Sequence, residues 1–123
     1  MKNLKILVLA LIAVPLLSGC LGVLAGAGGT ALWQGGKIIS EEMVSLEKGT
    51  KAVEAAFNNS DIATTNKVAR DEVVQIRGED YAGTKVAVDI FSKGPKNIRI
   101  EVRYGLGEED PARDLLNEIK KRL

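Results

Sequence analysis

Apolar and polar residues alternate strictly along two neighbouring segments in the second half of the chain. The apolar positions are Val86, Val88 and Ile90 in residues 84–91, and Ile98, Ile100, Val102 and Tyr104 in residues 97–104. A period of two is typical of a strand with one buried face and one exposed face. The intervening residues 92–96 include a Gly-Pro pair, which indicates a turn. We therefore predict a β-hairpin.

The register of this hairpin can be predicted from faces and charges together. Pairing Ile90 with Ile98 keeps the two apolar faces together and sets Asp89 opposite Arg99. The next register with matched faces sets Asp89 opposite Glu101, and directly opposed like charges destabilise a sheet. We therefore expect the register that pairs Ile90 with Ile98.

Three more segments are predicted strands. Residues 72–79 place Val74 and Ile76 on one face, whereas residues 62–69 form a weaker, Thr-rich candidate. Together with the hairpin these segments predict a meander of four strands, and residues 37–43 are a candidate for a fifth.

Two segments have helical spacing. Residues 46–58 repeat apolar side chains at helical intervals after Ser45, which is expected to cap the helix, and Gly49 inside it is expected to cost about 1 kcal/mol relative to Ala. The second helix is predicted to begin with Asp110 as N-cap and Pro111 at the first helical position. Its apolar face consists of Ala112, Leu115, Leu116, Ile119 and Leu123.

These elements predict an α+β fold with two layers. We expect an antiparallel sheet of four to five strands with two helices packed on one face.

The first 36 residues contain only two charges, Lys2 and Lys5. An apolar run, Ile6 to Leu17, follows this basic start and is too short to span a bilayer alone, which is the layout of a signal peptide. Small residues and a single cysteine come next. The alternative is an uncleaved membrane helix over residues 6–34, with Cys20 as a small apolar side chain inside it.

Leu17-Ser18-Gly19-Cys20 resembles the lipobox of bacterial lipoprotein precursors. The resemblance implies a signal peptide over residues 1–19, and a diacylglyceryl thioether and an N-acyl chain on Cys20 that hold the protein on a membrane. Leu21 in place of an Asp implies the outer membrane, facing the periplasm. The expected division is then a spacer at 20–36 and a folded domain at 37–123.

The spacer is rich in glycine and uncharged. Gly22, Ala25, Gly26 and Gly29 recur at a spacing that places small side chains on one helical face, where two helices can pack closely and form a homo-oligomer. The alternative is a flexible tether between the lipid and the domain. Under either interpretation Trp33 is expected at the membrane interface.

Composition excludes several chemistries. The chain has 17 Lys and Arg, 16 Asp and Glu, one Cys and no His. An intrachain disulfide, a Cys/His zinc site and a Ser-His-Asp triad are therefore impossible, and the near-zero net charge argues against nucleic acid as a partner. No catalytic residue, metal ligand or noncovalent cofactor is predicted.

The polar faces of the predicted strands carry charges of both signs. The candidate interaction face comprises Arg77, Asp89, Arg99, Glu101 and Arg103, with Lys85 beside them. Such a face can recognise an acidic partner or an envelope polymer, or it can simply be solvated and paired across strands.

Two short motifs precede the last helix. Gly105-Leu106-Gly107 superficially resembles a dinucleotide loop, but the third glycine is absent and a strand-to-helix turn is the alternative. The acidic run over residues 108–110 is a candidate for a divalent cation or for acids favoured at a helix N-terminus.

From Gly29 to the end, the order of elements is similar to that of a family of small, uncharacterised bacterial lipoproteins catalogued as a domain of unknown function. The shared features are the lipobox, the Gly-rich spacer, the helix ending at Phe57, the strands and the terminal RIEVRYGLGEEDPARDLLNEIKKRL. The resemblance implies no catalytic residues.

We expect a membrane-anchored envelope lipoprotein without enzymatic activity, which contributes structure or contacts an envelope protein. The alternatives are a membrane-associated assembly component that oligomerises through the spacer, and a carboxylate- or cation-dependent hydrolase.

Overall fold

The computed structural model describes residues 31–123. The lipobox and the small-residue stripe lie outside these residues, so the predictions for them stay predictions. The positions concerned are Leu17, Ser18, Gly19, Cys20, Gly22, Ala25, Gly26 and Gly29.

The described part of the chain forms one antiparallel sheet of six strands with two helices, and its strand order is β1-β2-β6-β5-β4-β3. The strands are β1 (Leu32–Gln34), β2 (Lys37–Glu42), β3 (Ala63–Ala69), β4 (Val73–Glu79), β5 (Lys85–Gly94) and β6 (Asn97–Tyr104). The helices are α2 (Leu46–Asn59) and α3 (Glu109–Lys120). Strands β3 to β6 form the predicted meander, and β2 joins it at β6.

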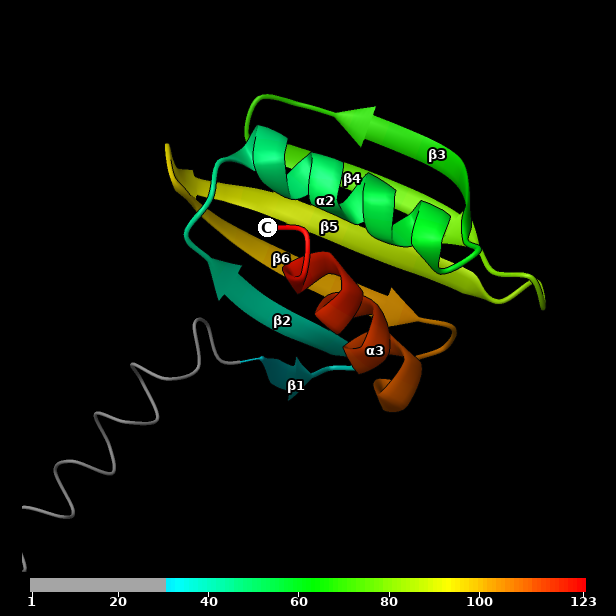
Figure 1. Ribbon diagram of the computed structural model, residues 1–123. Helices are drawn as coiled ribbons and strands as arrows, with labels where there is room; N and C mark the ends of the chain where they lie inside the picture. Colours follow the sequence, from blue (N-terminus) through cyan, green and yellow to red (C-terminus); the bar gives the residue numbers. More distant parts are fainter. Residues whose placement is uncertain (1–30) are drawn as a thin grey trace, which may run out of the picture. The chain divides into compact units, whose positions relative to one another are not determined.

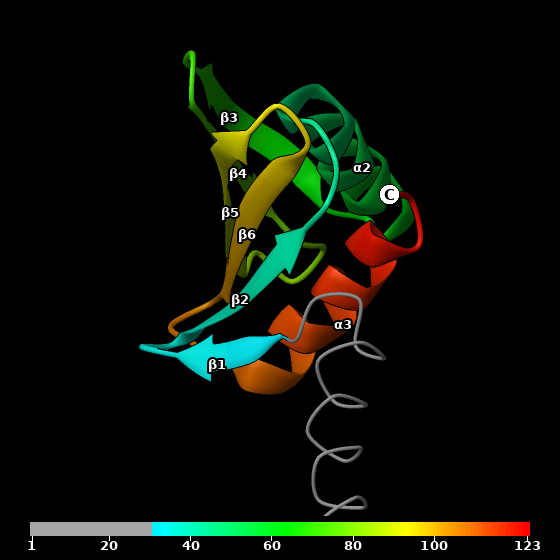
Figure 2. The ribbon, with the colours of Figure 1, turned by 90° about the vertical axis from the view of Figure 1, so that its left-hand side faces the viewer.

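Both helices lie side by side on the same face of the sheet, as Figures 1 and 2 show from two directions. The predicted two-layer α+β architecture is therefore confirmed, but the sheet has six strands rather than four to five. The additional strand, β1, has only three residues and lies in the segment that the sequence assigns to the spacer.

Strand β1 explains why the folded unit begins before Lys37. Trp33 lies opposite Ile38 of β2 and packs, half-buried, against the hydrophobic core. This side chain is thus part of the domain's own packing, and its position at a membrane interface stays a prediction.

The core lies between the sheet and the helices. Alternating positions of β4, β5 and β6 supply its sheet side, as the sequence predicts, and the apolar faces of both helices supply the other side. Its fully buried members include Ile76, Val88, Ile90, Ile100, Val102, Val53, Phe57, Leu116 and Ile119.

The two helices begin differently from each other. The Ser45 hydroxyl accepts a hydrogen bond of 3.2 Å from the Lys48 amide, which confirms the predicted cap of α2. Helix α3 begins two residues earlier than predicted, with Glu108 rather than Asp110 at the N-cap. Pro111 is tolerated there because the first amides of a helix have no acceptor within it. Within residues 31–123, neither helix is long and apolar enough to cross a membrane.

The register predicted for the β5–β6 hairpin is wrong. Ile90 lies opposite Ile100 rather than Ile98, and Asp89 lies opposite Glu101 rather than Arg99. The cause is the turn, because β5 continues to Gly94, which pairs with Asn97 and leaves a connection of two residues.

A β-bulge then matches the faces of the two strands. With a two-residue connection and no irregularity, Ile90 would lie opposite Glu101, and the core side of one strand would meet the polar side of the other. The register shifts between Ser92 and Gly94, so one extra residue is absorbed at Lys93. The shift brings Ile90 opposite Ile100 and returns both apolar faces to the core.

Helix α2 packs closely on the sheet at Gly49. A Cβ atom built on Gly49 would lie 2.4 Å from Cδ1 of Ile98, and Gly49 is buried. Glycine at this position lowers helix propensity, but its lack of a side chain permits the close packing of α2 on the β5–β6 hairpin.

We predict that Gly49→Ala lowers the free energy of unfolding by about 1–3 kcal/mol, because overpacking at Ile98 exceeds the gain in helix propensity. Denaturant unfolding of residues 31–123 measures the change. Ile98→Val removes the clashing Cδ1 atom and serves as the control background. Gly49→Ala should be neutral or stabilising there, and an equal loss in both backgrounds would contradict the packing explanation.

Candidate functional site

The face of the sheet that α2 and α3 leave uncovered, called the open face below, carries the candidate interaction residues. Residues of β4, β5 and β6 that alternate with the core positions point to this face. The structure brings all five predicted side chains together on it: Arg77, Asp89, Arg99, Glu101 and Arg103.

The observed register arranges these charges in rows across the strands. Arg77 on β4 and Arg103 on β6 both lie opposite Ala87 on β5, so a small side chain separates two cations. In the next row Asp89 and Glu101 lie directly opposite each other. An acidic row is therefore flanked by a row that carries arginines.

Each acid of this row forms ion pairs with cations of its own. The Asp89 carboxylate lies 2.7 Å from Nη1 of Arg77, and the Glu101 carboxylate binds Lys37 Nζ with Oε1 and lies 3.1 Å from Arg99 Nε with Oε2. These ion pairs offset the repulsion between Asp89 and Glu101, which had made this register look unfavourable from the sequence. Lys37 was missed as a partner because it is 64 residues from Glu101 in the sequence.

Glu101 is the centre of this network and is only 6% exposed, although it lies on the open face. The Arg99 guanidinium also lies over the Phe91 ring, 5.0 Å from its centroid, which adds a cation–π contact. The ion pair of Glu101 with Lys37 thus connects β6 to β2, that of Asp89 with Arg77 connects β5 to β4, and the cation–π contact joins β6 to β5.

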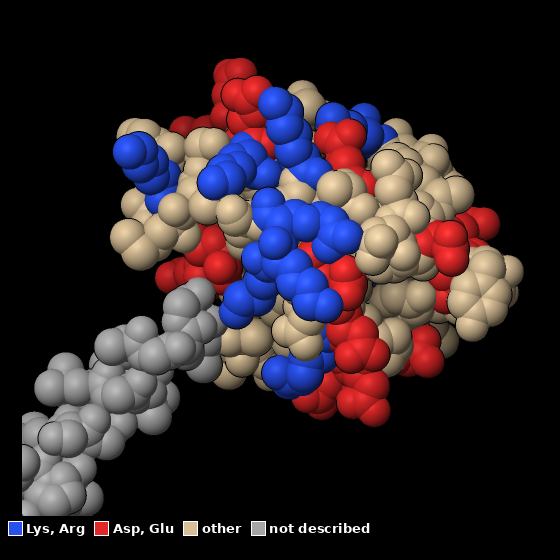
Figure 3. Space-filling model, viewed as in Figure 1, with Lys and Arg blue, Asp and Glu red and all other residues tan. Residues whose placement is uncertain are grey.

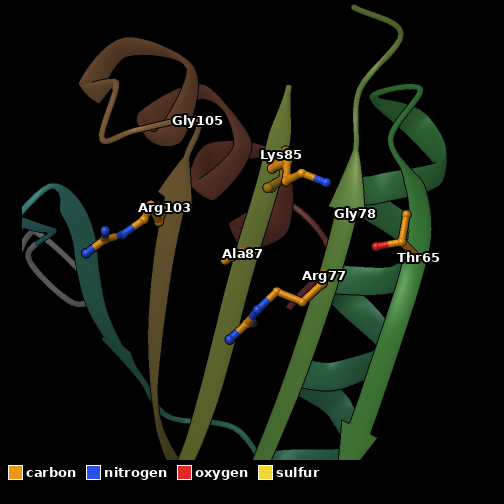
Figure 4. Close-up of a pocket in the computed structure, with 8 residues that line it drawn as sticks. Thr65, Arg77, Gly78, Lys85, Ala87, Arg103 and Gly105 are labelled. Atoms are coloured by element: carbon orange, nitrogen blue, oxygen red, sulfur yellow. The ribbon is translucent and has the colours of Figure 1, made fainter. Parts of the chain in front are cut away.

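Beside this network lies a groove of about 310 Å³, called the basic groove below. Its lining includes three cations and no carboxylate, and Figure 4 shows their side chains on the open face. The groove is lined by Thr65, Arg77, Gly78, Lys85, Val86, Ala87, Arg103 and Gly105. Ala87 lies between the two arginines because the register places it there, so the hollow depends on the tertiary arrangement.

Two of these cations have carboxylate partners outside the groove lining. Arg77 pairs with Asp89, and Lys85 Nζ lies 2.8 Å from Oε1 of Glu79, whose hydrogen bond raises the pKa of Lys85. Arg103 differs, because within the described residues its guanidinium donates only to the Gly35 carbonyl, at 3.1 Å.

A contact between the β4–β5 loop and the end of β6 was not identified from the sequence. Asp80 accepts hydrogen bonds from the amides of Ala82 and Thr84, at 2.9 and 2.8 Å, and from the Tyr104 hydroxyl, at 2.6 Å. This carboxylate ties the β4–β5 loop to the end of β6. The sequence signal is the run Asp80-Tyr81-Ala82-Gly83, which is typical of a turn stabilised by an aspartate side chain.

The same contact shifts two pKa values. The hydrogen bond from Tyr104, aided by the Thr84 amide, lowers the pKa of Asp80. Burial, followed by the hydrogen bond to Asp80, raises the pKa of Tyr104 well above its usual value of 10.0. The pair is therefore most favourable with Asp80 ionised and Tyr104 neutral.

The two motifs before α3 have structural roles. Gly105 and Gly107 have φ angles of +61° and +111°, which glycine adopts most easily, and a Cβ on Gly107 would lie 3.1 Å from the Cα of Gly36. The strand-to-helix turn is thus confirmed. Glu109 lies in the first turn of α3 and pairs with Arg113 at 2.7 Å.

The helix side of residues 31–123 differs from the open face, because its cations lie next to acids. No group of three or more potential metal ligands occurs in this part of the chain. The helix side carries many Lys and Arg side chains next to acids, as Figure 3 shows. Its cations include Lys121 and Arg122, which both pair with Glu118 at 3.0 Å, and Lys67, which pairs with Glu54 at 2.8 Å.

We predict that Glu101→Gln lowers the free energy of unfolding by about 1–3 kcal/mol, because it removes the charge that Lys37 and Arg99 share in a buried position. Denaturant unfolding of residues 31–123 measures the loss. Glu41→Gln is the matched control, since Glu41 lies opposite Arg99 on the neighbouring strand but is exposed. Equal effects of the two variants would show that burial at Glu101 does not matter.

We predict that the stability gap between the native chain and Tyr104→Phe depends on pH. The contribution of Asp80 is present above its unfolded pKa and is lost as pH falls through its lowered folded pKa. Above about pH 10 the unfolded Tyr104 ionises while the folded one stays neutral, which destabilises the native chain but not Tyr104→Phe. The gap should therefore be largest near neutral pH and smaller at both extremes.

Urea midpoints at acidic, neutral and alkaline pH measure this gap. Tyr81→Phe is the control, because Tyr81 is 91% exposed and makes no hydrogen bond with its hydroxyl in residues 31–123. A pH-independent gap for Tyr104→Phe, or the same pH dependence for Tyr81→Phe, would contradict the role of the Asp80 contact.

Comparisons with known proteins identify the family of the chain. A comparison with curated proteins finds no match. A family model described as a protein of unknown function, DUF3568, matches residues 3–122. This match confirms the expected membership of a family of unknown function, whereas the bacterial and lipoprotein parts of that expectation stay predictions. The chain belongs to the DUF3568 family.

Proposed function

We propose that this protein is a lipid-anchored protein of the cell envelope whose folded domain is a non-enzymatic interaction module. The open face is the surface through which it contacts a partner protein. The observation that carries the proposal is the basic groove, where three cations line a hollow of about 310 Å³ without a carboxylate in its lining.

The proposed anchor is Cys20. Leu17, Ser18 and Gly19 precede it, after an apolar run and a basic start. A diacylglyceryl thioether and an N-acyl chain together supply more than one buried chain, and stable attachment to a membrane needs more than one. Leu21 favours the outer membrane, with the domain facing the periplasm.

The arrangement of the open face favours binding over catalysis. The acids nearest the groove are engaged, Asp89 by Arg77 and Glu101 by Lys37 and Arg99, so none is placed as a free general base. The groove lining offers one hydroxyl, that of Thr65, and no acid or histidine beside it to activate it.

A sheet face that served only solvation would not need a hollow. Cross-strand pairing explains the acidic row and its cations, because each acid is neutralised within the domain. It does not explain why Arg103 lacks a carboxylate partner within residues 31–123. This cation is therefore available to a partner at little cost in internal ion pairs.

We predict that a photoreactive residue at Gln75 crosslinks the full-length protein to a partner in native membranes. Gln75 lies opposite Asp89 on the open face and is exposed. The matched control is the same photoreactive residue at Asn58, an exposed position of α2 on the helix side. An adduct from position 75 but not from position 58 is the expected result, measured by mass spectrometry of the crosslinked band.

The same preparations test the anchor. We expect the membrane-bound form to begin at an acylated Cys20, and Cys20→Ala to leave the membrane fraction and lose the adduct. Ser18→Ala keeps a small residue and should remain acylated. An N-terminus other than acylated Cys20, or equal adducts from both faces, would contradict the respective half of the proposal.

A further inference from the structure

The three cations of the basic groove differ in how far their side chains are already engaged by acceptors within the domain. Asp89 binds Arg77 through Nη1, which leaves other guanidinium N–H groups of Arg77 for further acceptors. The Lys85 side chain is 83% exposed although it pairs with Glu79. Arg103 is exposed, and among residues 31–123 it bonds only to a neutral carbonyl. The groove can therefore accept anionic groups while its present ion pairs persist.

The directions of these side chains indicate what kind of anion fits. In Figure 4 the guanidinium groups of Arg77 and Arg103 do not converge on the space above Ala87, and that of Arg103 points toward β2. The two arginines flank Ala87 on neighbouring strands, which places their backbones about 10 Å apart. One compact phosphate group needs donors that converge on it, so several separate anions suit this arrangement better.

An extended acidic peptide supplies several separate anions at regular intervals. Alternate residues of an extended chain point to the same side and are about 7 Å apart, a distance that long arginine side chains can accommodate. Each carboxylate can accept two hydrogen bonds from one guanidinium group, which gives Arg a geometric preference for it.

The groove continues into an apolar surface at one end. Lys85 and Gly105 also line a neighbouring hollow of about 720 Å³, together with Thr84, Leu106 and Glu108. Leu106 is fully exposed there and offers an apolar contact, whereas Glu108 repels carboxylates. The acidic residues of a ligand are thus favoured over Ala87, and an apolar residue is favoured beside Leu106.

We infer that the basic groove binds an acidic, extended peptide segment of the partner protein, with carboxylates at alternate positions bound by Arg77, Arg103 and Lys85. An apolar side chain next to these carboxylates contacts Leu106. This inference rests on the proposed function, since it names the chemistry of the partner at the open face.

The test uses the full-length chain, labelled with ¹⁵N and held in neutral detergent micelles. The probe is a blocked heptapeptide with Glu at its first, third and fifth positions, Leu at its seventh and Ser at the others, so that the Glu and Leu side chains point to the same side of the extended chain. We expect saturable shifts of the amide signals of Ala87, Arg103 and Gly105, and weaker binding as salt is added. The same peptide with Gln in place of Glu should give no saturable shifts.

Charge variants identify the residues responsible. Arg103→Gln should weaken binding about two- to fivefold, as expected for an exposed ion pair. Lys93→Gln removes an equal charge from the far end of β5, outside the groove lining, and should leave binding unchanged. Equal losses in the two variants would overturn the inference, because attraction would then depend on net charge alone.

Phosphate ligands and the crosslinking experiment distinguish a failure of this inference from a failure of the proposed function. Saturation of the same signals by inorganic pyrophosphate or anionic vesicles at lower concentration than the Glu peptide would overturn the inference in favour of a phosphate. If the Glu peptide fails to bind while position 75 still crosslinks to a partner in Arg103→Gln, the proposed function stands and this inference fails.

Discussion

The two-residue turn between Gly94 and Asn97, with the bulge before it, sets the register on which the rest of the sheet depends. A turn this short brings the two strands together with little freedom to slide. The bulge absorbs one residue and keeps both apolar faces on the helix side, because a slip of one residue would expose the core side of one strand. Ile98, at the start of β6, then lies directly beneath Gly49 of α2.

The same register creates the electrostatics of the open face. It opposes Asp89 to Glu101, which is unfavourable for an isolated hairpin. The cost is offset within the sheet, because Arg77 from β4 and Lys37 from β2 each reach one of these acids. Each acid of the repulsive pair thereby joins its own strand to the strand on its outer side, β6 to β2 and β5 to β4.

The basic groove follows from the same arrangement. Ala87 lies between Arg77 and Arg103 only because the register aligns these residues across three strands, and its small side chain leaves the hollow between them. The Asp80–Tyr104 contact ties the β4–β5 loop to the end of β6, next to Gly105 of the groove lining. The interaction surface that we propose is thus built from the features that stabilise the sheet.

The sequence by itself determined the elements whose signals are local. Alternation identified β4, β5 and β6, helical spacing identified both helices, and Ser45 marked the start of α2. It also identified the face that Arg77 and Glu101 share, because side-chain direction follows from position in a strand. The predicted lipobox is likewise a linear segment, so its prediction needs no fold.

Only the tertiary structure decided the features that depend on distant residues. Strand β1 is too short to have a pattern of its own, and its pairing with β2 defines it. The register could not be derived from the hairpin alone, because Lys37 and Arg77, which neutralise Glu101 and Asp89, lie on other strands. For the same reason the sequence indicated only the helix-propensity cost of Gly49, whereas the packing of α2 against Ile98 shows why glycine is needed there. Local free energies favour elements, whereas register, close approach and grooves are set by contacts between elements that meet only in the folded chain.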